Sequence, residues 1–256
     1  MVADALRAAG APSPTKIIDV ASGPGEPALT MAKSYPEASV LVTDAAEAML
    51  SLADVRIAEQ GVGERVTTCV MDLNDFSPVS DAHKPADLVT AQFALMFTED
   101  LPGSLEEING VLCEGGILVG TVWEDFFLLP LIRDTMTAVL GSAPPPPPIN
   151  PLSLKDVDLV DGALADAGFT TFGRHNETAT IDINLGPYKS DDTIKCTLIP
   201  VTPSLAELQE KGEHGDDVFG TAMEAMKTAI VEHGMISPEG DVVLTTSTYR
   251  YFVARK

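Results

Sequence analysis

The sequence of 256 residues has few basic residues and no long hydrophobic run. It holds 16 lysines and arginines against 38 acidic residues, a formal net charge of −22. Because such an acidic surface repels phosphate backbones and no basic cluster is present, we expect no nucleic-acid partner. No apolar run reaches the roughly 18 residues that span a bilayer, and residues 1–10 lack the pattern of a signal peptide. We therefore expect a soluble, cytoplasmic protein without a membrane span.

Cysteine is scarce as well. Cys69, Cys113 and Cys196 lie far apart, with no Cys-x-x-Cys and no Cys-His spacing. Three scattered thiols are typical of free cysteines in a reducing compartment, not of a disulfide framework. We expect no metal site.

Apolar residues make up 45% of the chain, enough for a sizeable core. Short apolar segments alternate with helical patterns in the first half, which predicts parallel βαβ units and an α/β fold. The expected strands are residues 16–21, 39–43, 65–71, 86–91 and 116–123, and the expected helices between them are 26–34, 45–60 and 105–113.

The pattern is looser outside this region. We expect helices at 2–9, 125–140, 154–167, 204–211 and 217–233, strand alternation within 170–184, and a last strand at 241–254. The five prolines at 144–148 predict a stiff surface loop. We expect one domain over residues 1–256, with cap or insertion segments at about 124–150 and 186–236. The oligomeric state is left open.

Residues 16–25, KIIDVASGPG, join the first strand to the first helix of this region. The apolar run stops at Gly23-Pro24-Gly25, and glycines at such a turn let the backbone approach a ligand. In a doubly wound sheet the crevice at this strand end is the usual nucleotide position. An ordinary strand-to-helix connection gives the same local pattern.

An aspartate stands at the end of each of the first three strands: Asp19, Asp44 and Asp72. Carboxyl ends of parallel strands share one edge of a sheet, so these residues predict an acidic groove. Asp44 lies about 20 residues beyond the glycine turn, where a carboxylate accepts hydrogen bonds from ribose hydroxyls. Asp72 is placed to accept from an adenine amine, with the N–H of Leu73 on a ring nitrogen. Asp19 either holds the loop or meets a cationic amine.

A dinucleotide fingerprint is the rival interpretation, because Gly23-x-Gly25-x-x-Ala28 also fits it. Pro27 argues against it, since proline has no N–H for a pyrophosphate. No tyrosine is followed four residues later by lysine, so the common hydride-transfer pair is missing. An acidic groove suits a cationic ligand, such as a sulfonium that carries an amino acid.

Further segments fit one family. They are DVASGPGE at 19–26, DAAEAM at 44–49, MDL at 71–73, DLVTAQFALMF at 87–97, GG at 115–116 and AGF at 167–169. Together they resemble the motifs of class I S-adenosylmethionine-dependent methyltransferases, especially the ubiquinone/menaquinone-biosynthesis type. In that type alanine often replaces the first glycine of the first motif, as Ala21 does here.

This resemblance implies a Rossmann-like class I methyltransferase fold. Such a fold has a seven-stranded, mostly parallel sheet with helices on both faces, an antiparallel last strand beside the fifth, and a helical cap. The implied cofactor is S-adenosyl-L-methionine. The implied cofactor-binding residues are Asp19, Ala21, Ser22, Gly23, Gly25, Asp44, Ala45, Met49, Asp72, Leu73, Gln92 and Phe93.

The acceptor is not carried over, because residues 1–15 are shorter than the N-terminal helical segment of the quinone-type enzymes. Candidates for the substrate side are Gln92, Phe97, Trp123, Phe127, Arg133, His175, Tyr188 and His214. Of these, Trp123, Arg133, His175 and Tyr188 are the catalytic candidates, although Trp123 and Phe127 also suit a core. The leading hypothesis is a methyltransferase acting on a small molecule. The alternatives are an NAD-dependent oxidoreductase and a non-catalytic nucleoside-binding protein of the same fold.

Overall fold

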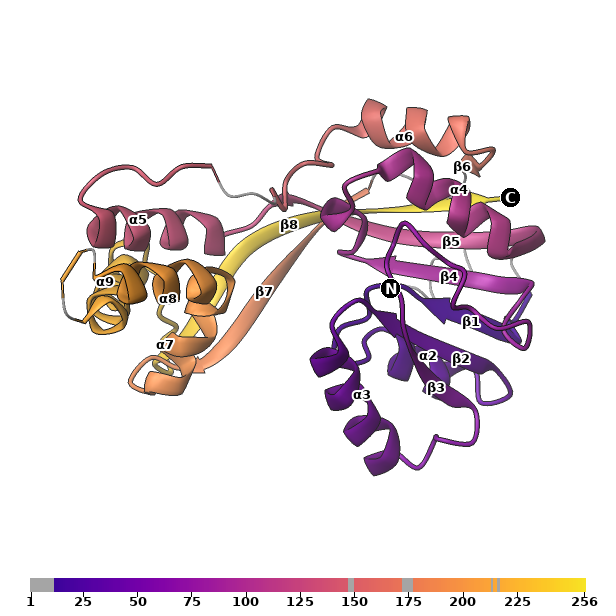
Figure 1. Ribbon diagram of the computed structural model, residues 1–256, viewed down its shortest axis with the longest axis horizontal. Helices are drawn as coiled ribbons and strands as arrows, with labels where there is room; N and C mark the ends of the chain where they lie inside the picture. The colour runs from indigo at the N-terminus through magenta and orange to yellow at the C-terminus, as the bar shows by residue number, and fades with distance from the viewer. Residues whose placement is uncertain (1–11, 147–149, 172–176, 213, 216) are drawn as a thin grey trace. The chain divides into compact units, whose positions relative to one another are not determined.

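The computed structural model describes residues 12–146, 150–171, 177–212, 214–215 and 217–256 (Figure 1). The helix expected at 2–9 lies outside these residues. The chain divides into two compact units. The first, here the sheet unit, comprises Met1–Glu124, Ile149–Thr178 and Tyr249–Lys256, and the second, the helical unit, comprises Asp125–Pro148 and Ala179–Thr248.

The sheet runs in the order β3-β2-β1-β4-β5-β8-β6, and β7 pairs with β8. Its strands are β1 (Lys16–Asp19), β2 (Ser39–Asp44), β3 (Val66–Val70), β4 (Ala86–Gln92), β5 (Leu112–Asp125), β6 (Thr170–Thr171), β7 (Glu177–Pro187) and β8 (Asp241–Arg255). The pairs β1–β2, β1–β4, β2–β3 and β4–β5 are parallel. The strand order reverses beside β1, which makes this the switch point where ligands bind in such sheets.

The expected number of strands is wrong: the described residues form eight, not seven. The segment expected as strand alternation within 170–184 contains two strands, β6 and β7, and both pair with the long β8. A pattern of alternating residues does not show where one strand ends and another begins when both pair with the same long strand. From the sequence alone, β6 and β7 are therefore expected as a single strand.

The position of the last strand is confirmed, since β8 lies between β5 and β6 and runs antiparallel to β6. The contacts between β8 and β5 show that these two strands also run antiparallel. The N–H of Lys256 donates to the carbonyl of Gly116 at 3.0 Å, while Phe252 lies against Gly120 farther along β5.

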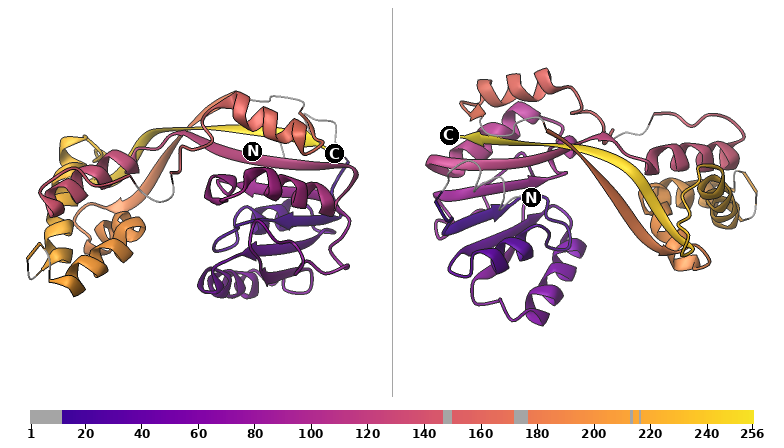
Figure 2. Two further views of the ribbon diagram at one scale, coloured as in Figure 1. Left: turned by 45° about the horizontal axis from the view of Figure 1, so that its top comes forward. Right: turned by 180° about the vertical axis from the view of Figure 1, so that it is seen from behind.

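Helices cover both faces of the sheet in the sheet unit (Figure 2). They are α2 (Ala28–Ser34), α3 (Glu47–Glu59), α4 (Leu101–Val111) and α6 (Val157–Asp166), with the short η1 (Leu95–Phe97) after β4. Ile17 and Ile18 are neighbours in β1, and both are fully buried. Because successive strand residues point to opposite faces, both faces must be covered. Ile17 packs in the cluster that holds residues of α2 and α3, whereas α4 packs against α6.

The helical unit has a hydrophobic core of its own. It contains α5 (Leu128–Leu140), α7 (Asp191–Leu198), η2 (Ile199–Val201), α8 (Thr202–Lys211) and α9 (Val218–Glu232). Leu131 of α5 and Met226 and Ile230 of α9 are fully buried in that core. Among the described residues no helix is long and apolar enough to cross a membrane.

Helix α7 was not expected from the sequence. Ser190 caps it by accepting from the N–H of Thr193, and Ile194 and Leu198 are buried on one face. Four residues apart, they form an apolar stripe too short to stand out in a polar stretch. The helix therefore depends on its cap and on packing inside the helical unit.

Candidate cofactor-binding site

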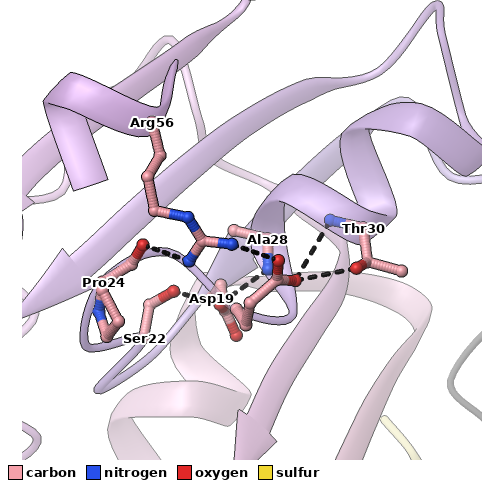
Figure 3. A network of polar contacts seen from close by, with 7 residues as sticks. Asp19, Ser22, Pro24, Ala28, Thr30 and Arg56 are labelled. Carbon is pink, nitrogen blue, oxygen red and sulfur yellow. Dashed lines mark hydrogen bonds and ion pairs between the residues drawn. The ribbon is translucent and has the colours of Figure 1, made fainter. Parts of the chain in front are cut away.

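Asp19, the last residue of β1, is fully buried and points into the glycine turn (Figure 3). Its carboxylate accepts hydrogen bonds from the hydroxyl of Ser22, the hydroxyl of Thr90 at 2.5 Å and the N–H of Ala28 at 3.0 Å. Burial raises the pKa of this carboxyl to about 7, although the three hydrogen bonds act to lower it. Of the two roles expected for Asp19, the geometry therefore supports the one of holding the loop.

The first turn of α2 has no free donor for a phosphate. The N–H groups of Ala28, Leu29 and Thr30 donate to the Asp19 carboxylate at 3.0 Å, the Gly25 carbonyl at 2.9 Å and the Glu26 carboxylate at 3.3 Å. Pro27, which precedes the helix, has no N–H to offer. A dinucleotide needs these donors for its pyrophosphate. The geometry therefore disfavours the NAD hypothesis.

Asp44 lies directly beside the glycine turn, as its spacing predicted. One of its carboxylate oxygens accepts from the N–H of Gly23 at 2.8 Å, and the other accepts from the N–H of Ala46 at 2.9 Å. Each oxygen retains a second lone pair, and the side chain is half-buried. Gly23 has a φ of +56°, and a Cβ built on it would meet no atom within 4 Å. Asp44 and the turn therefore border open space.

Asp72 and Leu73 follow β3 at the same edge. The N–H of Met71 donates to the carbonyl of Asp44 at 3.0 Å, which brings the end of β3 beside the end of β2. Asp72 is exposed, and one of its oxygens accepts from the backbone and side chain of Asn74 at 2.8 and 3.1 Å. The structure therefore brings Asp44 and Asp72 to one edge, while Asp19 turns inward.

Two residues that are not glycine adopt left-handed backbone angles at this edge. Ala21 follows β1 with a φ of 48°, and Phe93 follows β4 with a φ of 52°. Such conformations cost energy for residues with a Cβ and gather at ligand sites. The angle at Ala21 also gives a physical reason why glycine is common at this position of the resembling motif.

An aromatic cluster stands at the ends of β4 and β5. The rings of Phe93 and Trp123 stack with centroids 3.8 Å apart, and Tyr249 of β8 meets both edge-on at 5.7 and 6.4 Å. Trp123 is 8% exposed, and Gln92 beside Phe93 is half-buried. Sequence reasoning missed Tyr249, because its place depends on the register of two strands far apart in the chain.

The remaining cofactor candidates divide by exposure. Ala45 and Met49 lie exposed just before and within the first turn of α3, whereas Ser22 and Gly25 are buried. A Cβ on Gly25 would lie 3.2 Å from Leu29 and 3.5 Å from Ala53. Gly25 thus permits α2 and α3 to pack closely against the turn.

Four of the substrate-side candidates belong to the helical unit, whereas this edge belongs to the sheet unit. Arg133 belongs to the helical unit and forms an ion pair with Asp134 at 3.1 Å, with a side chain 66% exposed. The hydroxyl of Tyr188 donates to the carbonyl of Lys227 at 3.4 Å within the same unit. Phe127 packs on that unit's core, and His214 is exposed there. Phe97 of η1 is 49% exposed, and His175 lies outside the described residues.

Comparison with known proteins finds relatives for this part of the chain. Residues 17–116 match a family described as "Methyltransferase domain". The demethylmenaquinone methyltransferase of Bacteroides fragilis is 29% identical over 106 residues, which are 41% of this chain and 42% of that protein. The trans-aconitate 2-methyltransferase of Variovorax paradoxus is 28% identical over 107 residues, 42% of this chain and 38% of that protein. The matches thus span about two fifths of these relatives.

Solved structures extend the likeness to the whole chain. A protein from Bacillus halodurans described as a putative methyltransferase superimposes with a TM-score of 0.59. The alignment covers 100% of this chain and 98% of that one at 16% sequence identity. At this identity the match shows the fold alone, which is the Rossmann-like class I fold expected from the sequence.

Proposed function

We propose that this chain, which carries a class I methyltransferase domain and resembles the ubiquinone/menaquinone-biosynthesis type, transfers a methyl group from S-adenosylmethionine to a small-molecule acceptor. The observation that carries the proposal is the half-buried Asp44 carboxylate bonded to the Gly23 N–H beside open space. This is the edge at which class I folds hold a nucleoside, and it lies within the residues that match the family.

The residues at the edge fit the cofactor in charge and in hydrogen-bonding type. Asp44 would accept from the ribose hydroxyls, and Asp72 with the Leu73 N–H would meet the adenine. Backbone groups of the turn, with Gln92 and Phe93, would hold the methionine end. When bound, S-adenosylmethionine supplies an electrophilic methyl group on a positively charged sulfur. An acidic edge and an aromatic face both favour a cation of this kind.

The chain's own contribution to the reaction would be positioning. Methyl transfer is proposed to occur by in-line displacement, in which holding two reactants in line is worth roughly 7–11 kcal/mol. The Phe93–Trp123–Tyr249 cluster would exclude water at the end of β5. Trp123 is accordingly our leading substrate-side residue. A general base is needed only if the acceptor loses a proton.

Three features remain predictions. They are a catalytic role for Arg133, His175 or Tyr188, a capping role for the helical unit within a single methyltransferase domain, and a cytoplasmic location without nucleic-acid partners. The acceptor is not inferred from the relatives, whose names give demethylmenaquinone for one and trans-aconitate for another.

Binding and turnover together test the proposal. Calorimetry with S-adenosylmethionine, S-adenosylhomocysteine and NAD is expected to show binding of the first two only, and binding of NAD alone would refute it. Transfer of a labelled methyl group is then measured on thiol, thioether, amine, phenol and carboxylate acceptors. Cofactor binding without turnover on any of them would favour the non-catalytic alternative. Asp44→Ala is expected to weaken binding of S-adenosylhomocysteine, and Asp81→Ala, which removes an exposed charge elsewhere, is its control.

A further inference from the structure

The glycine turn is held from its outer side by one arginine of α3. The guanidinium of Arg56 donates to the carbonyl oxygen of Pro24 at 2.7 Å and to the carboxylate of Glu26 at 2.8 Å (Figure 3). Two hydrogen bonds from one planar guanidinium to two acceptors fix direction as well as distance. Arg56 therefore fixes two residues of the turn at once.

Glu26 connects Arg56 to the following helix, α2. Its second carboxylate oxygen accepts from the hydroxyl of Thr30 at 2.7 Å and from the N–H of Thr30 at 3.3 Å. Arg56 and Glu26 form an ion pair whose side chains are 34% and 40% exposed. A pair of this exposure stabilises a fold little by charge alone, so its effect lies in the geometry that it imposes on the turn.

The same face of α3 also packs against the turn. Ala53 lies 3.5 Å from a Cβ built on Gly25, and Arg56 follows Ala53 by three residues on that face. Helix α3 begins three residues after Asp44, whose carboxylate accepts from Gly23 on the inner side of the turn. Helix α3 therefore links the Asp44 carboxylate to the glycine turn, and both must be correctly placed for one ligand to contact them together.

We propose that Arg56 is a positioning residue for cofactor binding, which fixes Pro24 and Glu26 so that the backbone of the turn is already formed when the cofactor arrives. This inference rests on the proposed function. Arg56 would not touch the cofactor: its guanidinium is engaged with the turn itself. The gain comes from ordering the turn before binding, because a loop that must order on binding costs affinity.

Two variants separate the parts of this role. Arg56→Met keeps the aliphatic stem and removes the donors, and Arg56→Lys keeps the charge and removes the fork. Arg65→Met is the matched control. Arg65 also spans two elements by donating to the carbonyls of Ala32 and Ala38, at 2.8 and 3.3 Å, and both of these acceptors lie outside the turn.

The measurements are the Kd of S-adenosylhomocysteine, hydrogen exchange at the Gly23 and Gly25 amides without ligand, and Tm. Arg56→Met is expected to weaken binding by about tenfold and to speed exchange at both amides. Arg56→Lys is expected to fall between it and the wild type. Arg65→Met is expected to lower Tm while Kd stays within about twofold.

The outcomes distinguish failure of this inference from failure of the proposed function. A wild-type chain that does not bind S-adenosylhomocysteine overturns both. A wild-type chain that binds, with Arg56→Met unchanged in Kd and in exchange, overturns only the positioning role. Equal losses of affinity in Arg56→Met and Arg65→Met also overturn it, because they would report general destabilisation.

Discussion

Asp19 gives the sharpest prediction, because a buried carboxyl titrates near neutral pH at the centre of the turn. Its pKa is raised to about 7 in the folded chain by burial, and an unfolded aspartate titrates near 3.9. Between these values the unfolded chain has lost a proton that the folded chain keeps. The contribution of Asp19 to the free energy of unfolding is therefore fully present below about pH 4, decreases as the pH rises toward 7, and is constant above that.

The size of the effect follows from the same difference. A shift of about three pKa units corresponds to about 4 kcal/mol of unfolding free energy. Asp19→Asn keeps the shape and an acceptor for the Ala28 N–H, but it does not titrate. Urea denaturation of both proteins from about pH 4 to pH 8 isolates this group. The wild type is expected to lose about 4 kcal/mol relative to Asp19→Asn.

Asp87 supplies a control with the opposite sign. Burial opposes ionisation there too, but hydrogen bonds from Thr15 and Lys16 outweigh it and lower the pKa of this carboxyl. In urea denaturation extended below about pH 4, the unfolding free energy of the wild type should therefore rise relative to that of Asp87→Asn as the pH approaches 4. If the wild-type and Asp19→Asn stabilities ran parallel across the whole range, the raised pKa of Asp19 would be refuted.

Three further predictions concern binding, packing and charge. Asp44→Ala should weaken binding of S-adenosylhomocysteine by about 1–3 kcal/mol in calorimetry, and unchanged affinity would mean that the ribose lies elsewhere. Gly120→Ala should cost about 1–3 kcal/mol in urea denaturation, because its Cβ would overlap the ring of Phe252. At Gly110 in α4 a built Cβ meets no atom within 4 Å, so Gly110→Ala should instead raise the free energy of unfolding by about 0.5–1 kcal/mol. Equal effects of the two substitutions would contradict the packing at Gly120. Raising salt from about 0.01 to 1 M should raise Tm, since screening relieves repulsion in a chain of net charge −22; a falling Tm would contradict this.

The sequence predicts those parts of the architecture that depend on residues close together in the chain. Parallel strands are buried on both faces, so the runs around Ile17 and Ile18 are continuous and easily read. The neighbourhood of Asp44 and the glycine turn follows from a general rule of doubly wound sheets, without knowledge of any other contact. These signals depend on residues close in the chain or on fixed topology.

What the sequence leaves open depends on contacts between distant segments. Whether Asp19 faces a ligand or the turn is decided by Thr90 and Ala28, which come from other elements. The place of Tyr249 depends on the pairing of β8, and the strands β6 and β7 separate because β8 serves both.

The most direct test of the account is a crystal structure of the chain with S-adenosylhomocysteine bound. We expect the ribose hydroxyls within hydrogen-bonding distance of the Asp44 carboxylate, and the adenine beside Asp72 and Leu73. A nucleoside bound elsewhere, or one that leaves Asp44 without a ribose contact, would contradict the assignment of this edge as the cofactor site.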